Sequence, residues 1–476
     1  MLTDDLLKQI TEQAIVIDLD ECLQRNERGD AELFAYFFGN EARYDHSESA
    51  WYLWRGKSWM KDDTREVVGM MNQVAAEYLR KASDETAKGN KEKAGDFIKR
   101  AEQLQSLRRM TNVLTLATSL PVFALRGNEW DTPSMLLPVA NGIVDLTTGT
   151  FRDARPIDTI RSVSPVEWRG LNEPCPLWEK ALREIFNDDA ELIAFMQRLF
   201  GYCITGETKE QVLPILWGDG ANGKSTIMDL LSAVLGENIC FNTQADSLMD
   251  IRQNDGDGAR PFVVSLRNKR LIWASESREG QKLNAGLVKQ LTGDGYITAR
   301  PLFGNPVTFK QTHKIIMITN HCPRIPDGDD YAMWRRVLRV PFNTRFVLDP
   351  KLLNERKQDK DLLSKLRGEN SGILAWLVRG CLEWQKQGLN PPASASGRTV
   401  DHADFTEKKL KKSALVHAVR GTCAAVSWRH RRPSRTMVSL PKHPCITRRA
   451  RFLNLRTLLN LWIKFIVALP ASQFAR

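Results

Sequence analysis

Acidic side chains are absent from the end of this sequence: there is none from Lys408 to Arg476, where average composition would give about eight. Residues 397–476 hold 17 Lys and Arg against 3 Asp and Glu, whereas residues 1–396 hold 51 against 54. The net charge of +11 therefore belongs to the tail alone. The tail is either a basic arm that contacts nucleic acid in a salt-dependent way, or an out-of-frame or fused end. Its arginines mix with Cys, Trp and Pro in no pattern, which favours the second interpretation.

Other absences exclude several classes of protein. The eight cysteines include no CxxC pair, which argues against a zinc site and a disulfide framework. No apolar run reaches the ~20 residues of a membrane-spanning helix, since the nearest, Leu458–Leu469, is short and interrupted by Lys464. The first twenty residues hold five acidic side chains and no basic region, so we expect no secretory signal. The sequence predicts a cytoplasmic protein with reduced thiols and no membrane partner.

The composition that remains is globular, with 42% hydrophobic and 26% charged residues. At about 150 residues per domain, the 476 residues suggest roughly three domains. Residues 212–345 alternate apolar β-type runs with helical patterns, which predicts an α/β fold with a mainly parallel sheet covered by helices. We predict four segments in order: an N-terminal helix or arm (1–24), a mostly helical domain (25–172), the α/β domain (173–390) and the basic tail (391–476).

Local patterns predict further elements. An aromatic-rich segment from Ser49 to Trp59, with a turn at Gly56, predicts a small hairpin. Residues 64–126 have a helical period, and Gly89 and Asn90 predict a break between two helices. Short strands and tight turns are expected over 141–149. The N-terminal helix is expected over Thr3–Val16, and one further helix over Leu177–Gly201.

The strongest motif lies at residues 218–225. It fits G-x-x-x-x-G-K-[ST], with an apolar strand before it and a helix over Thr226–Leu235 after it. Such glycines let backbone N–H groups turn towards phosphate oxygens at a helix N-terminus. Lys224 is then expected to reach the β- and γ-phosphates, and the Ser225 hydroxyl to complete a Mg²⁺ shell. The predicted ATP-binding residues are Gly218, Asp219, Gly220, Ala221, Asn222, Gly223, Lys224, Ser225 and Thr226.

Two later strands end in side chains that such a site needs. Residues 271–275 form an apolar run that ends at Glu276, which we predict to hold the metal and polarise the attacking water. The residue just before it, Ser275, is not acidic, so the metal is expected to rest on Glu276 and Ser225. The run 314–319 ends at Asn320, whose amide can bond the γ-phosphate and the attacking water.

Basic and aromatic residues between and after these strands point to other contacts. Arg335 or Arg336, before the strand Val337–Phe342, is expected to reach a neighbouring subunit's nucleotide as an arginine finger. Two short β runs flank residues 303–306 and predict a hairpin. We expect Arg300, Phe303 and Lys310 to lie around its tip and grip a nucleic-acid backbone, with the aromatic ring stacking or wedging.

In this order, the motifs resemble those of superfamily-3 helicases, specifically the helicase portion of phage and plasmid primase-helicases related to satellite-phage and poxvirus enzymes. The segment from Trp51 to Gly149 resembles the helical domain that precedes the helicase in that family, so the resemblance covers about 25–390. It implies an AAA+-like P-loop ATPase that forms a ring, with six subunits expected. It further implies that Lys224, Ser225, Glu276 and Asn320 handle ATP and Mg²⁺, and that the hairpins move along single-stranded or forked DNA.

Family members often carry a primase ahead of the helicase, whereas fewer than twenty residues precede an acidic pair at Asp18 and Asp20 here. A separate primase is therefore an expected partner. Two alternatives to a replicative DNA helicase stay open. One is a non-translocating ATP switch or loader, which would need the phosphate loop but not the hairpin, and the other is a decayed remnant that binds DNA only through its tail.

Overall fold

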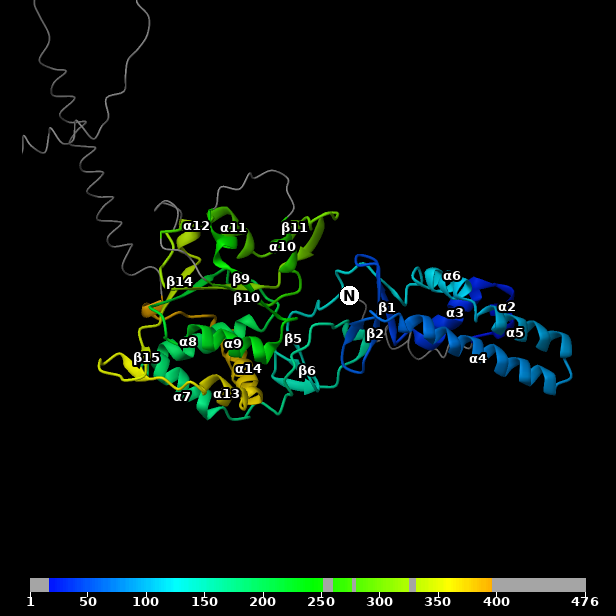
Figure 1. The fold of residues 1–476 in the computed structure, drawn as a ribbon, viewed down its shortest axis with the longest axis horizontal. Coiled ribbons are helices and arrows are strands. Elements are labelled where there is room, and N and C mark those ends of the chain that lie inside the picture. Colours follow the sequence, from blue (N-terminus) through cyan, green and yellow to red (C-terminus); the bar gives the residue numbers. More distant parts are fainter. Residues whose placement is uncertain (1–16, 251–259, 276–279, 325–330, 396–476) are drawn as a thin grey trace, which may run out of the picture. The chain divides into compact units, whose positions relative to one another are not determined.

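The computed structural model describes residues 17–250, 260–275, 280–324 and 331–395, with elements labelled as in Figure 1. The helix predicted over Thr3–Val16 and the basic tail from residue 396 onward lie outside the described residues. The first part of the chain is helical and contains two small sheets, and the second part contains one parallel sheet with helices on both faces.

The helices of the first part enclose an apolar core. Helix α4 buries Val67, Met71, Val74 and Tyr78, which recur every three or four residues and so share one helix face. Gly89, with a φ of +85°, separates α4 from α5 at the predicted break. The helices are α2 (Leu19–Gln24), α3 (Glu27–Phe38), α4 (Glu66–Ala87), α5 (Lys91–Gln103) and α6 (Leu107–Ala117).

A second break, which the sequence analysis missed, divides residues 91–117 into α5 and α6. The Ser106 hydroxyl accepts a hydrogen bond from the Arg109 backbone N–H at 3.4 Å and caps the new helix. Serine is a common N-cap because its oxygen satisfies an N–H group that has no partner within the helix. The expectation of two helices over 64–126 was therefore wrong, and the structure has three.

Two small sheets accompany these helices. The hairpin predicted from Ser49 to Trp59 is confirmed, since β2 pairs antiparallel with β3 and Gly56 has a φ of +78° between them. The first sheet has the order β3-β2-β1-β4 and the second β5-β6-β7. Their strands are β1 (Ala42–Asp45), β2 (Ala50–Trp54), β3 (Trp59–Lys61), β4 (Ala124–Leu125), β5 (Leu136–Val139), β6 (Gly142–Asp145) and β7 (Thr150–Arg152).

The second part is built on a five-stranded sheet with the order β14-β8-β13-β10-β9. Each neighbouring pair is parallel, which confirms the predicted α/β fold with a parallel sheet. The strands are β8 (Leu213–Trp217), β9 (Cys240–Gln244), β10 (Leu271–Ser275), β13 (Lys314–Thr319) and β14 (Val337–Pro341). Because the strands are parallel, the ends of β8, β10 and β13 lie at one edge of the sheet.

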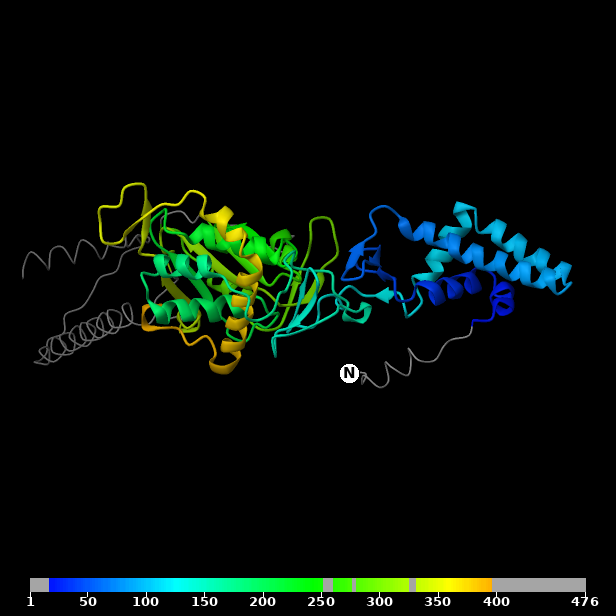
Figure 2. The same ribbon diagram turned by 90° about the horizontal axis from the view of Figure 1, so that it is seen from below.

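Helices cover both faces of this sheet (Figures 1 and 2). Alternate residues of β13 divide between two cores, with Ile316 and Ile318 packing into one and Ile315 and Met317 into the other. The first face carries α7 (Pro176–Ile185), α8 (Ala190–Cys203), α9 (Lys224–Leu235), α13 (Leu362–Arg367) and α14 (Asn370–Gln387). The second carries α10 (Pro261–Ser265), α11 (Ala285–Leu291), α12 (Tyr331–Trp334) and the hairpin of β11 (Tyr296–Ala299) and β12 (Val307–Lys310).

The single helix predicted over Leu177–Gly201 was wrong, because the structure has α7 and α8 there. Asn187 and Asp188 adopt left-handed φ values of 51° and 59°, and Asp189 then caps α8 by accepting from the Leu192 N–H at 3.0 Å. Asn and Asp tolerate this conformation better than most residues, which explains the break. The remaining elements are the β15–β16 pair (Arg345–Val347 and Glu355–Lys357) and the short 3-10 turns η1 (Pro156–Asp158), η2 (Ala245–Leu248) and η3 (Ala393–Ala395).

Candidate nucleotide and DNA site

The predicted phosphate loop joins the end of β8 to the start of α9. Gly218 has a φ of +149°, and a side chain there would collide with the Phe342 carbonyl oxygen. Gly223 has a φ of +88° directly before the helix. Both positions therefore need glycine for a physical reason, the first for close approach and the second for its left-handed backbone.

Lys224 folds back into this loop. Its Nζ donates to the Gly218 carbonyl at 2.6 Å and to Asn222 Oδ1 at 2.9 Å, and the residue is only 4% exposed. Burial lowers the pKa of this amine to about 8, although the charge of Asp219 acts in the opposite direction. The side chain is thus held at the mouth of the loop by neutral oxygens rather than by a carboxylate.

Asn320 meets Lys224 across the sheet edge, although 96 positions separate them. Its Oδ1 accepts from Lys224 Nζ at 3.3 Å. The reason is topological, since β13, which ends just before Asn320, lies directly beside β8. The structure therefore brings together two residues that the sequence analysis named from separate motifs.

Asn222 fixes the shape of the loop. Its Nδ2 donates to the Asp219 carbonyl and, at 3.2 Å, to the carbonyl of Phe342 after β14, while Oδ1 faces Lys224. Asn222 is 4% exposed, so these bonds are sheltered from water. A buried amine that bonds only neutral oxygens fits an anionic ligand such as a triphosphate, because the charge is not yet compensated.

The other loop residues are more accessible. Asp219, Gly220, Ala221 and Ser225 are exposed, while Thr226 is partly buried in the first turn of α9. Ala221 has a φ of +59°, and its carbonyl accepts from the Phe346 N–H at 2.7 Å, which ties the loop to β15. Exposed backbone at a helix N-terminus suits a phosphate group.

The predicted metal ligand Glu276 lies outside the described residues. The strand that leads to it is in place, since β10 ends at Ser275, which pairs with Ile318 of β13. This strand is thus one step further from β8 than the strand that carries Asn320. In the described ranges, no cluster of three or more His, Cys, Asp or Glu side chains could hold a metal ion.

Arg335 and Arg336 lie at the opposite edge of the sheet from the phosphate loop. The Arg336 carbonyl accepts from the Leu213 N–H at 2.7 Å, at the start of β8, whereas the loop follows the end of that strand. Four residue steps along a strand correspond to about 13 Å. Arg335 is exposed, whereas Arg336 is 8% exposed and bonds within its own domain. Of the two arginines, Arg335 is therefore the accessible one.

The predicted hairpin is confirmed as an antiparallel pair in which Ala299 faces Val307 and Tyr296 faces Lys310. Phe303 lies in the connecting loop, fully exposed, with a φ of +60°. Arg300 directly follows β11 and is also exposed. The prediction that Lys310 lies around the tip was wrong. The connecting loop is long and spans 300–306, so the pair next to it is Ala299 with Val307, and Lys310 lies three residues further on, at the other end of the hairpin.

Gln211 is a site residue that the sequence analysis missed. Its Oε1 accepts from Arg335 at 2.8 Å and from Arg336 at 3.3 Å. No motif signals this role, since the sequence shows only a polar residue before an apolar strand. The contact depends on the pairing of β14 with β8. This pairing brings Arg335 and Arg336 to Gln211, although 124 and 125 positions separate them from it in the sequence.

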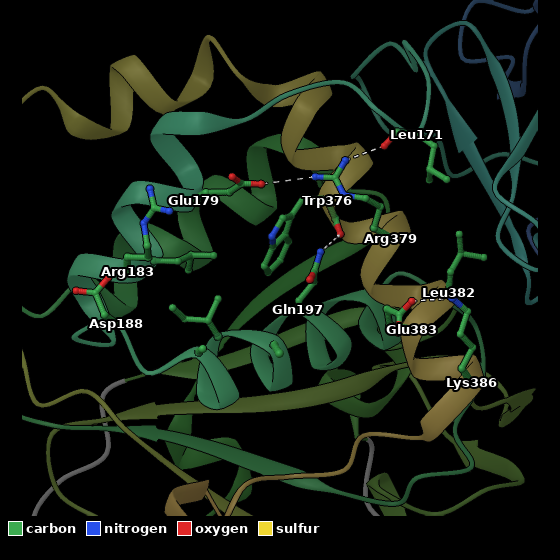
Figure 3. A pocket seen from close by; sticks show the side chains of 14 residues that line it. Leu171, Glu179, Arg183, Asp188, Gln197, Trp376, Arg379, Leu382, Glu383 and Lys386 are labelled. Carbon is green, nitrogen blue, oxygen red and sulfur yellow. Dashed lines mark hydrogen bonds and ion pairs between the residues drawn. The ribbon is translucent and has the colours of Figure 1, made fainter.

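A groove of about 640 Å³ lies among α7, α8 and α14 (Figure 3). Arg379 crosses it, donating to the Leu171 carbonyl at 2.7 Å and lying 3.9 Å from Glu179. Gln197 donates to the Trp376 carbonyl at 3.1 Å on its floor. None of the predicted site residues lines this groove, so it adds nothing to the nucleotide site.

Across the described ranges, no helix has the length and apolar character needed to span a membrane.

Two family models match the chain. Residues 31–187 match a family described as D5 N terminal like, and residues 216–336 match a family of unknown function. The second match contains the phosphate loop, Asn320, the hairpin and both arginines.

Several viral proteins are similar to this chain. A protein of Acanthamoeba polyphaga mimivirus, named as a candidate helicase, is 25% identical over 377 residues, which is 74% of this chain and 39% of that protein. The uncoating factor OPG117 of Vaccinia virus is 29% identical over 234 residues, 46% of this chain and 29% of the relative. A protein of African swine fever virus, named as a candidate primase, is 26% identical over 238 residues, 48% and 24% of the two chains. This chain thus spans well under half the length of these relatives.

Among solved structures, the apo C-terminal region of NrS-1 aligns with 74% of this chain and 68% of its own, with a TM-score of 0.42 and 12% identity.

Proposed function

Because this chain belongs to the family of phage and viral primase-helicases with a D5-like domain, we propose that it is an ATP-dependent DNA helicase of DNA replication. In this proposal, it moves along single-stranded DNA as a ring of six subunits. The observation that carries the proposal is the meeting of Lys224 and Asn320 at 3.3 Å on the sheet edge, in a domain that also presents an exposed hairpin. The pair of Lys224 and Asn320 can respond to a nucleotide, and the hairpin can contact DNA.

The nucleotide step follows from the charges at the loop. The Lys224 amine exchanges its neutral partners, Gly218 and Asn222, for the β- and γ-phosphate oxygens of ATP. The amide of Asn320, already beside the amine, orients the attacking water and the terminal phosphate. Ser225 and Glu276 would hold Mg²⁺, which neutralises the developing charge on the phosphates.

The DNA step rests on the exposed hairpin loop. Phe303 is fully exposed, and stacking of one base on an aromatic ring contributes about 1–3 kcal/mol. Arg300, three residues away, supplies a positive charge to the phosphate backbone. Lys310, at the other end of the hairpin, extends the contact along the strand rather than at the tip.

The position of Arg335 supports the proposed ring. Its exposed guanidinium lies at the sheet edge opposite to the phosphate loop of its own subunit, so it acts on the nucleotide of a neighbour. Arginine fingers of this kind raise the rate of nucleotide hydrolysis by about 10³- to 10⁵-fold.

Names of relatives agree with this assignment. The mimivirus relative carries a helicase name and the African swine fever virus relative a primase name. We therefore propose a primase as a functional partner of this chain, on the same polypeptide or a separate one.

Unwinding of a forked DNA duplex tests the proposal, with three proteins compared. The wild type is expected to displace the strand with ATP. Phe303→Ala should bind single-stranded DNA about 5- to 150-fold more weakly, the equivalent of one lost stack. Phe151→Ala is the matched control, because Phe151 is also an exposed aromatic residue, on β7 outside the hairpin.

The alternatives predict other results. A non-translocating switch would hydrolyse ATP at a rate that neither DNA nor Phe303→Ala alters. A remnant would show no hydrolysis at all, and Lys224→Ala would leave its DNA binding unchanged. Equal unwinding by the wild type and Phe303→Ala would refute the role of the hairpin.

A further inference from the structure

We propose that Gln211 is a positioning residue that couples the exposed Arg335 to the DNA hairpin, through a chain of hydrogen bonds that includes Arg336 and Thr292. The inference rests on the proposed function, in which Arg335 acts on a neighbour's nucleotide and the hairpin binds DNA. It assigns roles to Gln211, which lies outside the motifs, and to Thr292, to which neither the motifs nor the resemblance gives a role.

Arg336 is the centre of the chain. Its Nε donates to Thr292 Oγ1 at 3.1 Å, one terminal nitrogen to the Ala332 carbonyl at 2.7 Å, and the other to Gln211 Oε1 at 3.3 Å. Arg336 and Thr292 are 8% and 6% exposed. A buried guanidinium held from three directions cannot change its position without moving its partners, because each lost bond leaves a buried charge poorly solvated.

Thr292 connects Arg336 to the root of the hairpin. Its hydroxyl accepts from Arg336 and donates to the Val288 carbonyl at 2.7 Å, within α11. Gln311, after β12, donates from its side chain to the Leu291 carbonyl and from its backbone to the Gly295 carbonyl. Thr292 therefore sits between the two points that anchor the hairpin, so a displacement of the hairpin reaches Arg336 directly.

Gln211 connects Arg336 to Arg335. One amide oxygen accepts from both guanidinium groups, at 2.8 and 3.3 Å. Gln211 has a left-handed φ of +53° and precedes β8, the strand that ends at the phosphate loop of the same subunit. Gln211 thus contacts the arginine presented to the neighbour and, through Arg336 and Thr292, is linked to the base of the hairpin, while the strand that follows it leads to the phosphate loop.

The chemistry of the acceptor supports a positioning role. An amide is neutral, so it orients Arg335 without compensating its charge, which remains available to an anion on the neighbouring subunit. A carboxylate at this place would form an ion pair with Arg335 and compete with that anion. Orientation with the charge preserved is what a residue acting on a neighbour's phosphate requires.

ATP turnover with and without single-stranded DNA tests the inference in Gln211→Ala and Gln211→Glu. Both are expected to bind ATP and DNA as the wild type does, and to lose about 3- to 30-fold of the DNA-stimulated rate, a range typical of residues that couple two sites. Gln211→Glu matches the native side chain in size, so it remains informative if Gln211→Ala folds poorly. Gln197→Ala is the matched control, since it removes a different glutamine hydrogen bond of this domain, the one donated to the Trp376 carbonyl, and should keep the full stimulation.

A double-mutant cycle of Gln211→Ala with Thr292→Val separates coupling from local damage. If the chain transmits the signal, the second change should add little to the loss of stimulation caused by the first. Additive losses, or normal stimulation in both Gln211 variants, would overturn the coupling while the helicase proposal stands. A wild type whose turnover ignores DNA would instead refute the helicase proposal itself.

Discussion

Replacing Lys224 with methionine should weaken nucleotide binding severely and leave the empty protein nearly as stable as before. In the empty loop the amine is 4% exposed and bonds neutral oxygens, so its burial is only partly compensated. Towards a phosphate at about 4 Å, it gains about 4 kcal/mol at an effective dielectric constant of 20. Because the amine gives up its bonds to Gly218 and Asn222 when it binds the phosphate, we expect Lys224→Met to lose only about 2–4 kcal/mol of binding free energy. This loss corresponds to about 30- to 1000-fold in affinity for the nucleotide.

Thermal unfolding with a non-hydrolysable ATP analogue measures this loss. At a concentration of about 100 times its Kd, the analogue should stabilise the wild type by about 2.7 kcal/mol. For a domain of this size that is a rise of about 5–10 °C in Tm. At the same concentration, Lys224→Met should gain less than about 0.9 kcal/mol.

The control is Lys269→Met. Lys269 is another partly buried lysine of the same domain, and it bonds the carbonyls of Glu237 and Asn238 at 2.6 and 3.1 Å. Its variant should keep the full nucleotide-dependent rise. A wild-type rise in Lys224→Met would refute the assignment of the loop, whatever its sequence.

Three further predictions concern pH, subunit contacts and stability. Burial lowers the pKa of Lys224 to about 8, so the amine loses its charge as pH rises through 8. The affinity for ATP, measured by titration calorimetry, should therefore fall by up to about tenfold per pH unit above that value. The affinity of Lys224→Arg for ATP should not change with pH in this range. Arg335→Ala mixed with wild type should lower turnover more than in proportion to its share, and strict proportionality would contradict action between subunits. Asp30, fully buried, accepts from Arg100 at 3.0 Å and from Arg109 at 2.8 Å, so Asp30→Asn should destabilise the helical part by about 3–5 kcal/mol in urea unfolding, and an unchanged midpoint would contradict the paired charges.

Local motifs predicted the parts of the site that depend on neighbouring residues. The phosphate loop was predictable because a strand, six loop residues and a helix follow one another between β8 and α9. The hairpin was predictable because two alternating runs flank a turn signal. The sheet itself followed from strands and helices that alternate along the chain.

Contacts that depend on strand order or on register were not predictable. Lys310 was placed at the hairpin tip because seven loop residues look like a shorter turn until the pairing of Ala299 with Val307 is known. The contacts of Gln211 arise only because β14 lies beside β8. The break between α7 and α8 depends on left-handed Asn187 and Asp188, whose effect on a strongly helical pattern was underestimated.

The rate of ATP hydrolysis by the purified wild-type chain, titrated with single-stranded DNA, tests the central claim most directly. The account predicts a basal rate that rises to saturation with added DNA, because the strand engages the hairpin and the hairpin is tied to the nucleotide machinery. A rate that stays at background, or one that ignores the DNA at every concentration, would contradict it.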